Sequence, residues 1–438
     1  MSAARDLVID RATALFIAWI CLDASIAIYL VAYGIGTASR LLLIAGIVLF
    51  GYVAIRGGAP GARRIDALGA AIVAVHCAIF LAFPFRADPG PPPPTDLYRV
   101  FPAVVLIGLG IAAVLTVARR GAQGRAMTAA LVLAVVVGMV FRVVIVATDA
   151  PPFFDVFYIQ QAAGDALLGG IDPYLTQVWV NGYLYLPLAA IAAAAGELFG
   201  DARWASIAGD LMVVVALVVF ARRVGAAAAA GLALAAVWVW WAAGLYIVWQ
   251  GFPEPVLIGF AALAAAALAG EAPRTVLAGV LVGLAAATKQ FGLGLIPFLP
   301  LRRGGWKAVV AAGITWLIVV VPFAAWHPER FFEGALFSLV REPARDYAFN
   351  VLNWPGISID PPLVLVFVIS LAFGWLCQRR QDSPVGAWLA GSVGLFLVAF
   401  ALNRIAFVNY FAIPMALMLF LVLAYASGQP ADPDPEAG

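Results

Sequence analysis

Long apolar segments separated by short polar connections make up most of the chain. Apolar runs of roughly 17–25 residues are long enough to cross a bilayer as helices. The first such runs lie at 12–35, 40–56, 66–85, 99–118 and 127–147, and later ones at 204–221, 306–326, 361–378, 384–402 and 405–425. A further run, 275–301, is interrupted by Lys289 and Gln290. The pattern predicts an all-α, polytopic transmembrane protein with about 13 or 14 membrane segments and no soluble domain.

The composition supports a membrane protein and excludes several kinds of site. The chain is 64% hydrophobic and only 11% charged, and its net charge of +2 is too small to indicate a nucleic-acid partner. The three cysteines are isolated in apolar runs, which favours packing over disulfides or metal ligation. The two histidines have no neighbours at zinc-ligand spacing. We therefore expect the bilayer as a partner and neither metal nor cofactor.

Basic residues in the short connections predict the orientation. Lysine and arginine mark cytoplasmic loops, and they follow the second run (Arg56, Arg63, Arg64) and the fourth (Arg119, Arg120, Arg125). Segment 148–182 is then external. Arg222 and Arg223 fall inside only if 183–199 does not cross, so we expect a juxtamembrane or re-entrant helix there. Segments 249–255 and 327–360 and the break at Lys289 then face outward.

The polar stretch 149–187 is the strongest candidate for a site. Asp155 begins a segment with helical apolar spacing that ends at Gly169 and Gly170. A helix N-terminus favours the anionic carboxylate, so Asp155 is a candidate general base, but its spacing alone favours a simple N-cap role. Asp149 is the second choice, as one of a carboxylate pair or as an interfacial acid. Asp165 fits the polar face of this helix, and Asp172-Pro173-Tyr174 is typical of a turn.

Other charged residues lie in or beside apolar segments, where an unpaired charge is costly. Lys289 interrupts an apolar run, which suggests either a phosphate partner or a lysine that reaches the membrane surface. Glu254, close to Gln250, either binds hydroxyl groups or starts a helix. Arg142 lies in the middle of a predicted span and requires a partner, for which Asp23 and Asp210 are the candidates.

Two later segments combine polar and aromatic residues. Mixed charges usually indicate a solvated face, but arginine, asparagine and tryptophan together also suit a sugar and a phosphate. In 327–360 the candidates are His327, Arg330, Arg341, Arg345, Asn353 and Trp354. A last polar patch consists of Asn403, Arg404, Asn409 and Tyr410.

The order of these features resembles a known family. The pattern consists of Asp155-x-x-Tyr158, an alanine-rich helix, Leu168-Gly169-Gly170-Ile171-Asp172-Pro173-Tyr174, Tyr185-Leu186-Pro187-Leu188, Trp249-Gln250-Gly251, and a glycine-containing run from Ala278 to Lys289. It resembles GT-C membrane glycosyltransferases, especially bacterial polyprenyl-phosphate-mannose-dependent α-mannosyltransferases. Here, however, five helices precede the aspartate loop, Tyr-Leu-Pro replaces the usual Tyr-Pro-Pro, and Trp249 replaces an asparagine.

The resemblance implies an inverting transfer of a hexose, with mannose favoured, from a polyprenyl-phosphate carrier to a lipid or glycan acceptor. Asp155, or Asp149 in its place, would be the base, and Lys289 with an external arginine would stabilise the leaving phosphate. Neither metal nor nucleotide is implied, and the site would face the periplasm or exterior of a bacterial inner membrane. The implied substrate-binding residues are Tyr158, Asp172, Tyr174, Tyr185, Gln250, Glu254, Lys289, Gln290, His327, Arg341, Arg345, Asn353, Trp354 and Arg404.

This interpretation divides the chain into three predicted parts. Residues 1–120 form an N-terminal four-helix addition, 121–426 the catalytic membrane domain with external loops 148–203 and 327–360, and 427–438 a disordered cytoplasmic tail. A transporter or lipid flippase is an alternative that predicts inverted repeats and charges at the membrane midplane. A surface-polysaccharide ligase or polymerase is another, and it predicts an external loop rich in arginine and histidine.

Overall fold

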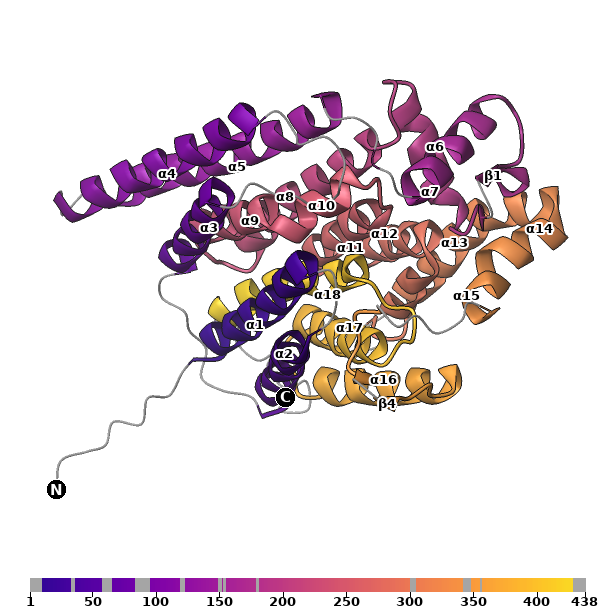
Figure 1. The fold of residues 1–438 in the computed structure, drawn as a ribbon. Coiled ribbons are helices and arrows are strands. Elements are labelled where there is room, and N and C mark those ends of the chain that lie inside the picture. Colours follow the sequence, from indigo (N-terminus) through magenta and orange to yellow (C-terminus); the bar gives the residue numbers. More distant parts are fainter. Residues whose placement is uncertain are drawn as a thin grey trace.

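The computed structural model is almost entirely helical (Figure 1), which confirms the all-α fold class. It describes residues 10–32, 36–56, 65–82, 95–118, 123–148, 152, 155–178, 181–299, 305–341, 348–354 and 357–427. Asp149, Arg345 and the predicted tail beyond residue 427 lie outside this set. The five runs that precede the polar stretch are helices, as predicted: α1 (Arg11–Ala32), α2 (Thr37–Arg56), α3 (Ile65–Ala82), α4 (Thr95–Ala118) and α5 (Gln123–Thr148).

The rest of the chain alternates helices with short irregular segments. The polar stretch contains α6 (Asp155–Leu168), the 3₁₀ turn η1 (Pro173–Leu175), the antiparallel hairpin β1 (Gln177–Val178) and β2 (Asn181–Gly182), and α7 (Pro187–Glu197). Then follow α8 (Trp204–Arg223), α9 (Ala228–Trp240), α10 (Ala242–Trp249), α11 (Glu254–Leu268), α12 (Thr275–Thr288), the 3₁₀ helix η2 (Gln290–Leu295) and α13 (Trp306–Trp326). The last elements are α14 (Pro328–Phe332), the π-helical turn η4 (Glu333–Phe337), α15 (Ser338–Arg341), the hairpin β3 (Asn353–Trp354) and β4 (Ile357–Ser358), α16 (Leu363–Gln378), α17 (Pro384–Ala401) and α18 (Val408–Ala426).

Membrane-spanning length separates the helices into two groups. Within the described residues, nine helices are long and apolar enough to cross, and α9 with α10, bent by 54°, can form one more span. Four shorter apolar helices, α7, α11, α12 and α16, account for the other predicted segments. With 11 residues, α7 is about 17 Å long, well short of the bilayer core, in agreement with a segment 183–199 that does not cross.

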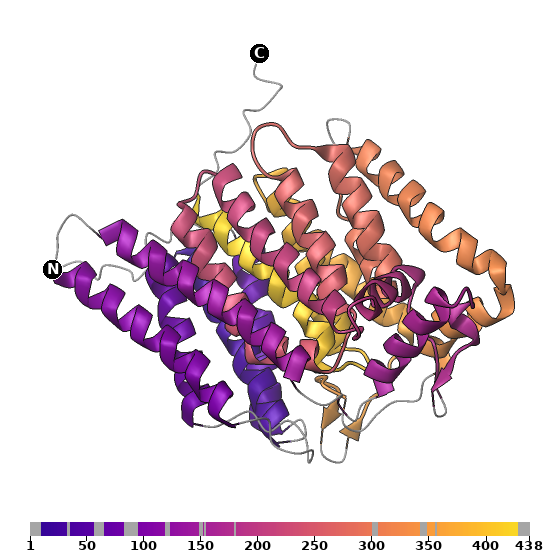
Figure 2. The same ribbon diagram turned by 90° about the horizontal axis from the view of Figure 1, so that it is seen from above.

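The bundle is organised around α18, which is completely buried. It packs against α1, α8, α11 and α17, while α3 packs on α9 and α4 on α5 (Figures 1 and 2). Small residues allow close approach: α8 lies so near the start of α11 that a side chain at Gly209 would overlap the Pro255 backbone. The first four helices therefore pack directly on the rest of the bundle.

Arg142 is fully buried and pairs with Asp210, one of its two candidate partners, at 2.6 Å. Asp210 also accepts from Trp238 Nε1 at 2.9 Å. The Arg142 guanidinium donates to the carbonyl oxygens of Trp238 and Val239, which lie near the bend after α9. The pair thus joins α5, α8 and α9, and every partner compensates part of the cost of burying the charges.

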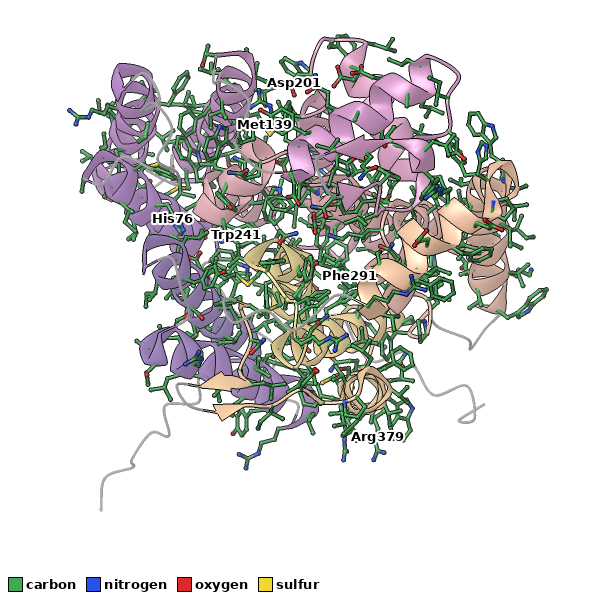
Figure 3. All side chains as sticks on the ribbon, turned by 45° about the vertical axis from the view of Figure 1, so that its right-hand side comes forward. His76, Met139, Asp201, Trp241, Phe291 and Arg379 are labelled. Atoms are coloured by element: carbon green, nitrogen blue, oxygen red, sulfur yellow. The ribbon has the colours of Figure 1, made fainter. Side chains whose placement is uncertain are left out.

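Asp23, the other candidate for Arg142, has different partners because α1 lies beside α3 and the bend between α9 and α10. It contacts His76 Nε2 at 3.2 Å and accepts from Trp241 Nε1 at 2.8 Å. Figure 3 shows His76 and Trp241 near each other on these elements. The pairing of Arg142 with Asp23 was therefore the wrong alternative.

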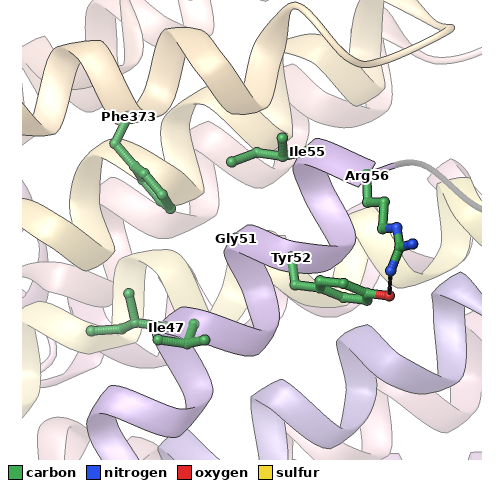
Figure 4. Close-up of a pocket in the computed structure, with 7 residues that line it drawn as sticks. Ile47, Gly51, Tyr52, Ile55, Arg56 and Phe373 are labelled. Carbon is green, nitrogen blue, oxygen red and sulfur yellow. Dashed lines mark hydrogen bonds between the residues drawn. The ribbon is translucent and has the colours of Figure 1, made fainter.

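A surface pocket of about 420 Å³ lies where α2 meets Phe373 of α16 (Figure 4). Its lining is apolar except at one end, where Arg56 donates to the Tyr52 hydroxyl. The lining residues are Ile47, Val48, Gly51, Tyr52, Ile55, Arg56 and Phe373. None of them belongs to the predicted site.

Replacing Arg142 by methionine should destabilise the protein by about 3–5 kcal/mol, because the buried Asp210 carboxylate loses its cation. The measurement is the thermal unfolding midpoint in detergent. Arg222→Met, at an exposed position in the last turn of α8, is the control and should change the midpoint little. Equal midpoints for wild type and Arg142→Met would contradict the assigned role of the pair.

Candidate functional site

Asp155 is the first residue of α6, as the sequence predicts. Its Oδ2 accepts a hydrogen bond from Asn181 Nδ2 at 2.8 Å, so the β1–β2 hairpin returns over the start of the helix. The side chain is half-buried, whereas Asp165, farther along the same helix, is exposed as expected for its polar face. The Asn181 amide thus holds the Asp155 carboxylate in place at the N-terminus of α6.

The start of α6 is held by a neighbouring turn and by Arg203. The Arg203 guanidinium lies 5.2 Å from the centre of the Phe157 ring, pairs with Asp201 at 2.6 Å and donates to the Val146 carbonyl at 3.2 Å. Phe157 also packs on Gly251, where an added Cβ would lie 3.2 Å from its ring. Asp155 is therefore fixed by contacts with the end of α5 and with the α10–α11 turn.

The α10–α11 turn contains Gln250 and Glu254. Gly251 has φ of +70°, and the amides of Gly251 and Phe252 bond to Val248 and Ile247, the glycine-dependent Schellman ending of a helix. This ending directs the chain straight into α11, whose first residue is Glu254. Both Gln250 and Glu254 are completely buried.

Lys289 lies at the predicted interruption, between α12 and η2, and is buried. Its ammonium is 2.6 Å from Glu254 Oε1, and the same oxygen accepts from Asn409 Nδ2 at 2.6 Å. The rings of Tyr185, Phe291 and Tyr410 surround the ammonium, with centres 5.1, 5.2 and 4.5 Å away. The ends of α11, α12 and α18 thus meet in one polar core, and α10, which ends directly before Gln250, packs against α11 and α18.

Tyr185 connects this core with Asp155. Burial, then the charge of Glu254, and to a smaller extent Tyr410 and Asp155, raise the pKa of the Tyr185 phenol well above its ordinary value. The phenol therefore remains a hydrogen-bond donor at neutral pH. Tyr185 is thus influenced electrostatically by both Glu254 and Asp155, and its ring lies against the Lys289 ammonium.

Asp172 forms the predicted turn. One of its oxygens accepts from the Tyr174 amide at 2.9 Å, and the other lies 2.7 Å from His327 Nδ1. The Tyr174 hydroxyl donates to the Tyr185 carbonyl at 2.7 Å. Asp172 is fully buried, whereas the His327 side chain remains 44% exposed. The turn therefore positions both the loop that holds Tyr185 and a histidine from a distant part of the chain.

The segment from α14 to α15 covers the same loop. Gln290 Nε2 donates to the carbonyls of Leu184, at 2.8 Å, and Ala335. Phe331 packs edge-on against Tyr174, with ring centres 5.0 Å apart. Gln290 thus contacts both segments through their backbones.

The remaining candidates are less closely connected. Arg341 lies 3.6 Å from Glu333, and Arg404 pairs with Asp360 at 3.1 Å and donates to the Val340 carbonyl at 2.8 Å. Both arginines therefore lie along the η4–α15 segment. Tyr158 is half-buried next to Phe157. Asn353 and Trp354 form β3, where only the backbone is described, and Asp149 and Arg345 lie outside the described residues.

Sequence reasoning missed Asn181 and Arg203, which organise the site, and it included Asn409 only as a member of the last polar patch. Asn181 and Asn409 are neutral, and each acts on a carboxylate that is far away in the sequence. A polar residue at the start of an apolar helix was the available signal for Asn409. Arg203 lies two residues after Asp201 at a helix start, a position that is usually assigned to the surface.

Residues 182–358 match the model of glycosyltransferase family 87. The match indicates a glycosyltransferase, and it extends over Tyr185, Gln250, Glu254, Lys289 and His327, while Asp155 lies before it. Comparison with curated proteins found no match, and comparison with solved structures found none either.

Gln290→Met should lower the unfolding midpoint, with a loss of about 1–3 kcal/mol, because two partly buried carbonyls lose their donor. Limited proteolysis should cut the variant faster within residues 177–186, which this amide helps to hold. An unchanged midpoint and proteolysis pattern would contradict this structural role and would leave direct contact with substrate as the explanation.

Proposed function

We propose that the protein is an inverting hexosyltransferase that takes a sugar, with mannose favoured, from a polyprenyl-phosphate carrier. The acceptor is a lipid or glycan hydroxyl at the periplasmic or outer face of a bacterial plasma membrane. The observation that carries the proposal is the position of Asp155 at a helix N-terminus, held by Asn181 and next to the segment that matches a glycosyltransferase family.

In this reaction Asp155 is the general base. Its carboxylate takes the proton of the acceptor hydroxyl, the oxygen attacks the anomeric carbon, and the bond from that carbon to the phosphate oxygen breaks. The electron pair leaves with the phosphate, so polyprenyl phosphate is released and the configuration at the anomeric carbon inverts. A positioned base contributes roughly 10²- to 10⁴-fold to such a step.

The leaving phosphate requires cationic or donor groups. His327 suits this role because its side chain is partly exposed and its Nδ1 is held 2.7 Å from Asp172. Arg341 and Arg404 lie on the adjoining η4–α15 segment and offer further charge. Lys289, in contrast, is buried and already paired with Glu254.

Asp155→Asn should reduce sugar transfer by roughly 10²- to 10⁴-fold, since the amide keeps the shape of the side chain but cannot accept the proton. The assay measures transfer from polyprenyl-phosphate-mannose to endogenous acceptors in membranes that contain the protein. Asp149→Asn is tested in parallel because Asp149 is the second candidate base.

Asp165→Asn is the matched control, because Asp165 is exposed on the same helix and should not affect the rate. Full activity of Asp155→Asn would show that another group is the base. No consumption of any polyprenyl-linked sugar by the wild type would reject the proposed donor class.

A further inference from the structure

Three polar side chains in the core beside Asp155 carry buried atoms without a hydrogen-bond partner among the described residues. They are both amide atoms of Gln250, the Oε2 atom of Glu254 and the Oδ1 atom of Asn409. The side chains are 0–2% exposed. We call Gln250, Glu254 and Asn409 the amide–carboxylate cluster.

Hydrogen bonds to one oxygen of Glu254 set the orientation of the Glu254 carboxylate and the Asn409 amide. Lys289 and the Asn409 amide nitrogen both bind Glu254 Oε1, which leaves Glu254 Oε2 and Asn409 Oδ1 unused. The nitrogen of Asn409 must face the carboxylate, since its oxygen would be repelled there. Buried polar atoms without partners are costly. Several of them in one polar core indicate a ligand that supplies the missing hydrogen bonds.

The donors and acceptors of the cluster indicate the chemical class of the ligand. The cluster offers three acceptors, one of them a carboxylate oxygen, and one amide NH₂ group as donor. A hydroxyl group both donates and accepts, so adjacent hydroxyls complete this set. Phosphate is mainly an acceptor and negatively charged, and the Lys289 charge is already neutralised by Glu254. The cluster therefore suits a neutral polyol and disfavours phosphate.

The cluster also lies close to the proposed base. Gly251, the residue after Gln250, contacts Phe157 at the start of α6. Tyr185 is affected electrostatically by both Glu254 and Asp155. The cluster and the start of α6 are therefore connected through the α10–α11 turn and through Tyr185.

We propose that the amide–carboxylate cluster binds hydroxyl groups of the transferred hexose and so determines which sugar is accepted. The inference depends on the proposed function and assigns its sugar subsite. Lys289 then acts as a positioning residue that holds Glu254, and it does not contact phosphate.

The test compares binding of two probes to the purified protein in detergent: a short-chain polyprenyl-phosphate-mannose and the same polyprenyl phosphate without sugar. Wild type should bind the mannosyl lipid roughly tenfold more tightly, because only this lipid supplies hydroxyls to the cluster. Equal affinity for both lipids would overturn the inference, whatever the transfer assay shows. Absence of transfer with preserved sugar-dependent binding would instead count against the proposed reaction alone.

The Gln250→Met variant tests whether the cluster causes the preference for the mannosyl lipid. This variant should lose most of the sugar-dependent difference, keep its affinity for the sugar-free lipid, and unfold at the wild-type midpoint or above, because its amide has no partner to lose. Gln378→Met is the matched control, since the Gln378 amide donates to the Phe298 carbonyl at 2.9 Å. It should lower the midpoint and leave the preference for the mannosyl lipid unchanged.

Two results with these variants would overturn the assignment. One is a Gln250→Met protein that retains the full preference for the mannosyl lipid, as expected if buried water alone fills the cluster. The other is a result with Lys289→Met. This variant is expected to lose only the sugar-dependent part of binding. Equal weakening of both lipids by Lys289→Met would show a phosphate contact.

Discussion

Glu254 and Lys289 face each other at 2.6 Å inside the protein, at the start of α11 and the end of α12, and the site depends on this contact. An ion in such surroundings is stable only with a partner and additional hydrogen bonds. Asn409 of α18 supplies one of these bonds, and three aromatic rings enclose the ammonium. The charges therefore fix how α11, α12 and α18 meet, and they bring Tyr185 and the polar loop against that junction.

Breaks in regular helices create the polar space that this arrangement needs. The chain leaves α-helical geometry at Lys289, where α12 gives way to η2, and at Trp241, where α9 and α10 bend by 54°. Backbone groups released at a break require new partners, since lipid offers none. Near Trp241, Arg142 is such a partner, because it donates hydrogen bonds to the carbonyls of Trp238 and Val239. A buried charge thus lies at or near each of these two breaks, Lys289 at one and Arg142 at the other.

Much of the fold could be predicted because it depends on local patterns. The apolar runs predict the helices, the spacing after Asp155 predicts α6, and the interruption at Lys289 predicts a break at that residue. Pairings across the sequence could not be assigned in this way. Arg142 required a partner, but only helix packing selects Asp210 over Asp23. The contact of Lys289 with Glu254 and that of His327 with Asp172 likewise depend on how distant helices and loops meet.

Hydrogen bonds connect the N-terminal helices α1 and α3 with elements of the site. Asp23 of α1 accepts from Trp241, and His76 of α3 holds the opposite side of that carboxylate. Trp241 precedes α10, a helix of eight residues that ends directly before Gln250. The indole of Trp19 on α1 donates to the Met415 carbonyl of α18, the helix that carries Asn409. Two of the elements that form the amide–carboxylate cluster, α10 and α18, are therefore held in place by α1.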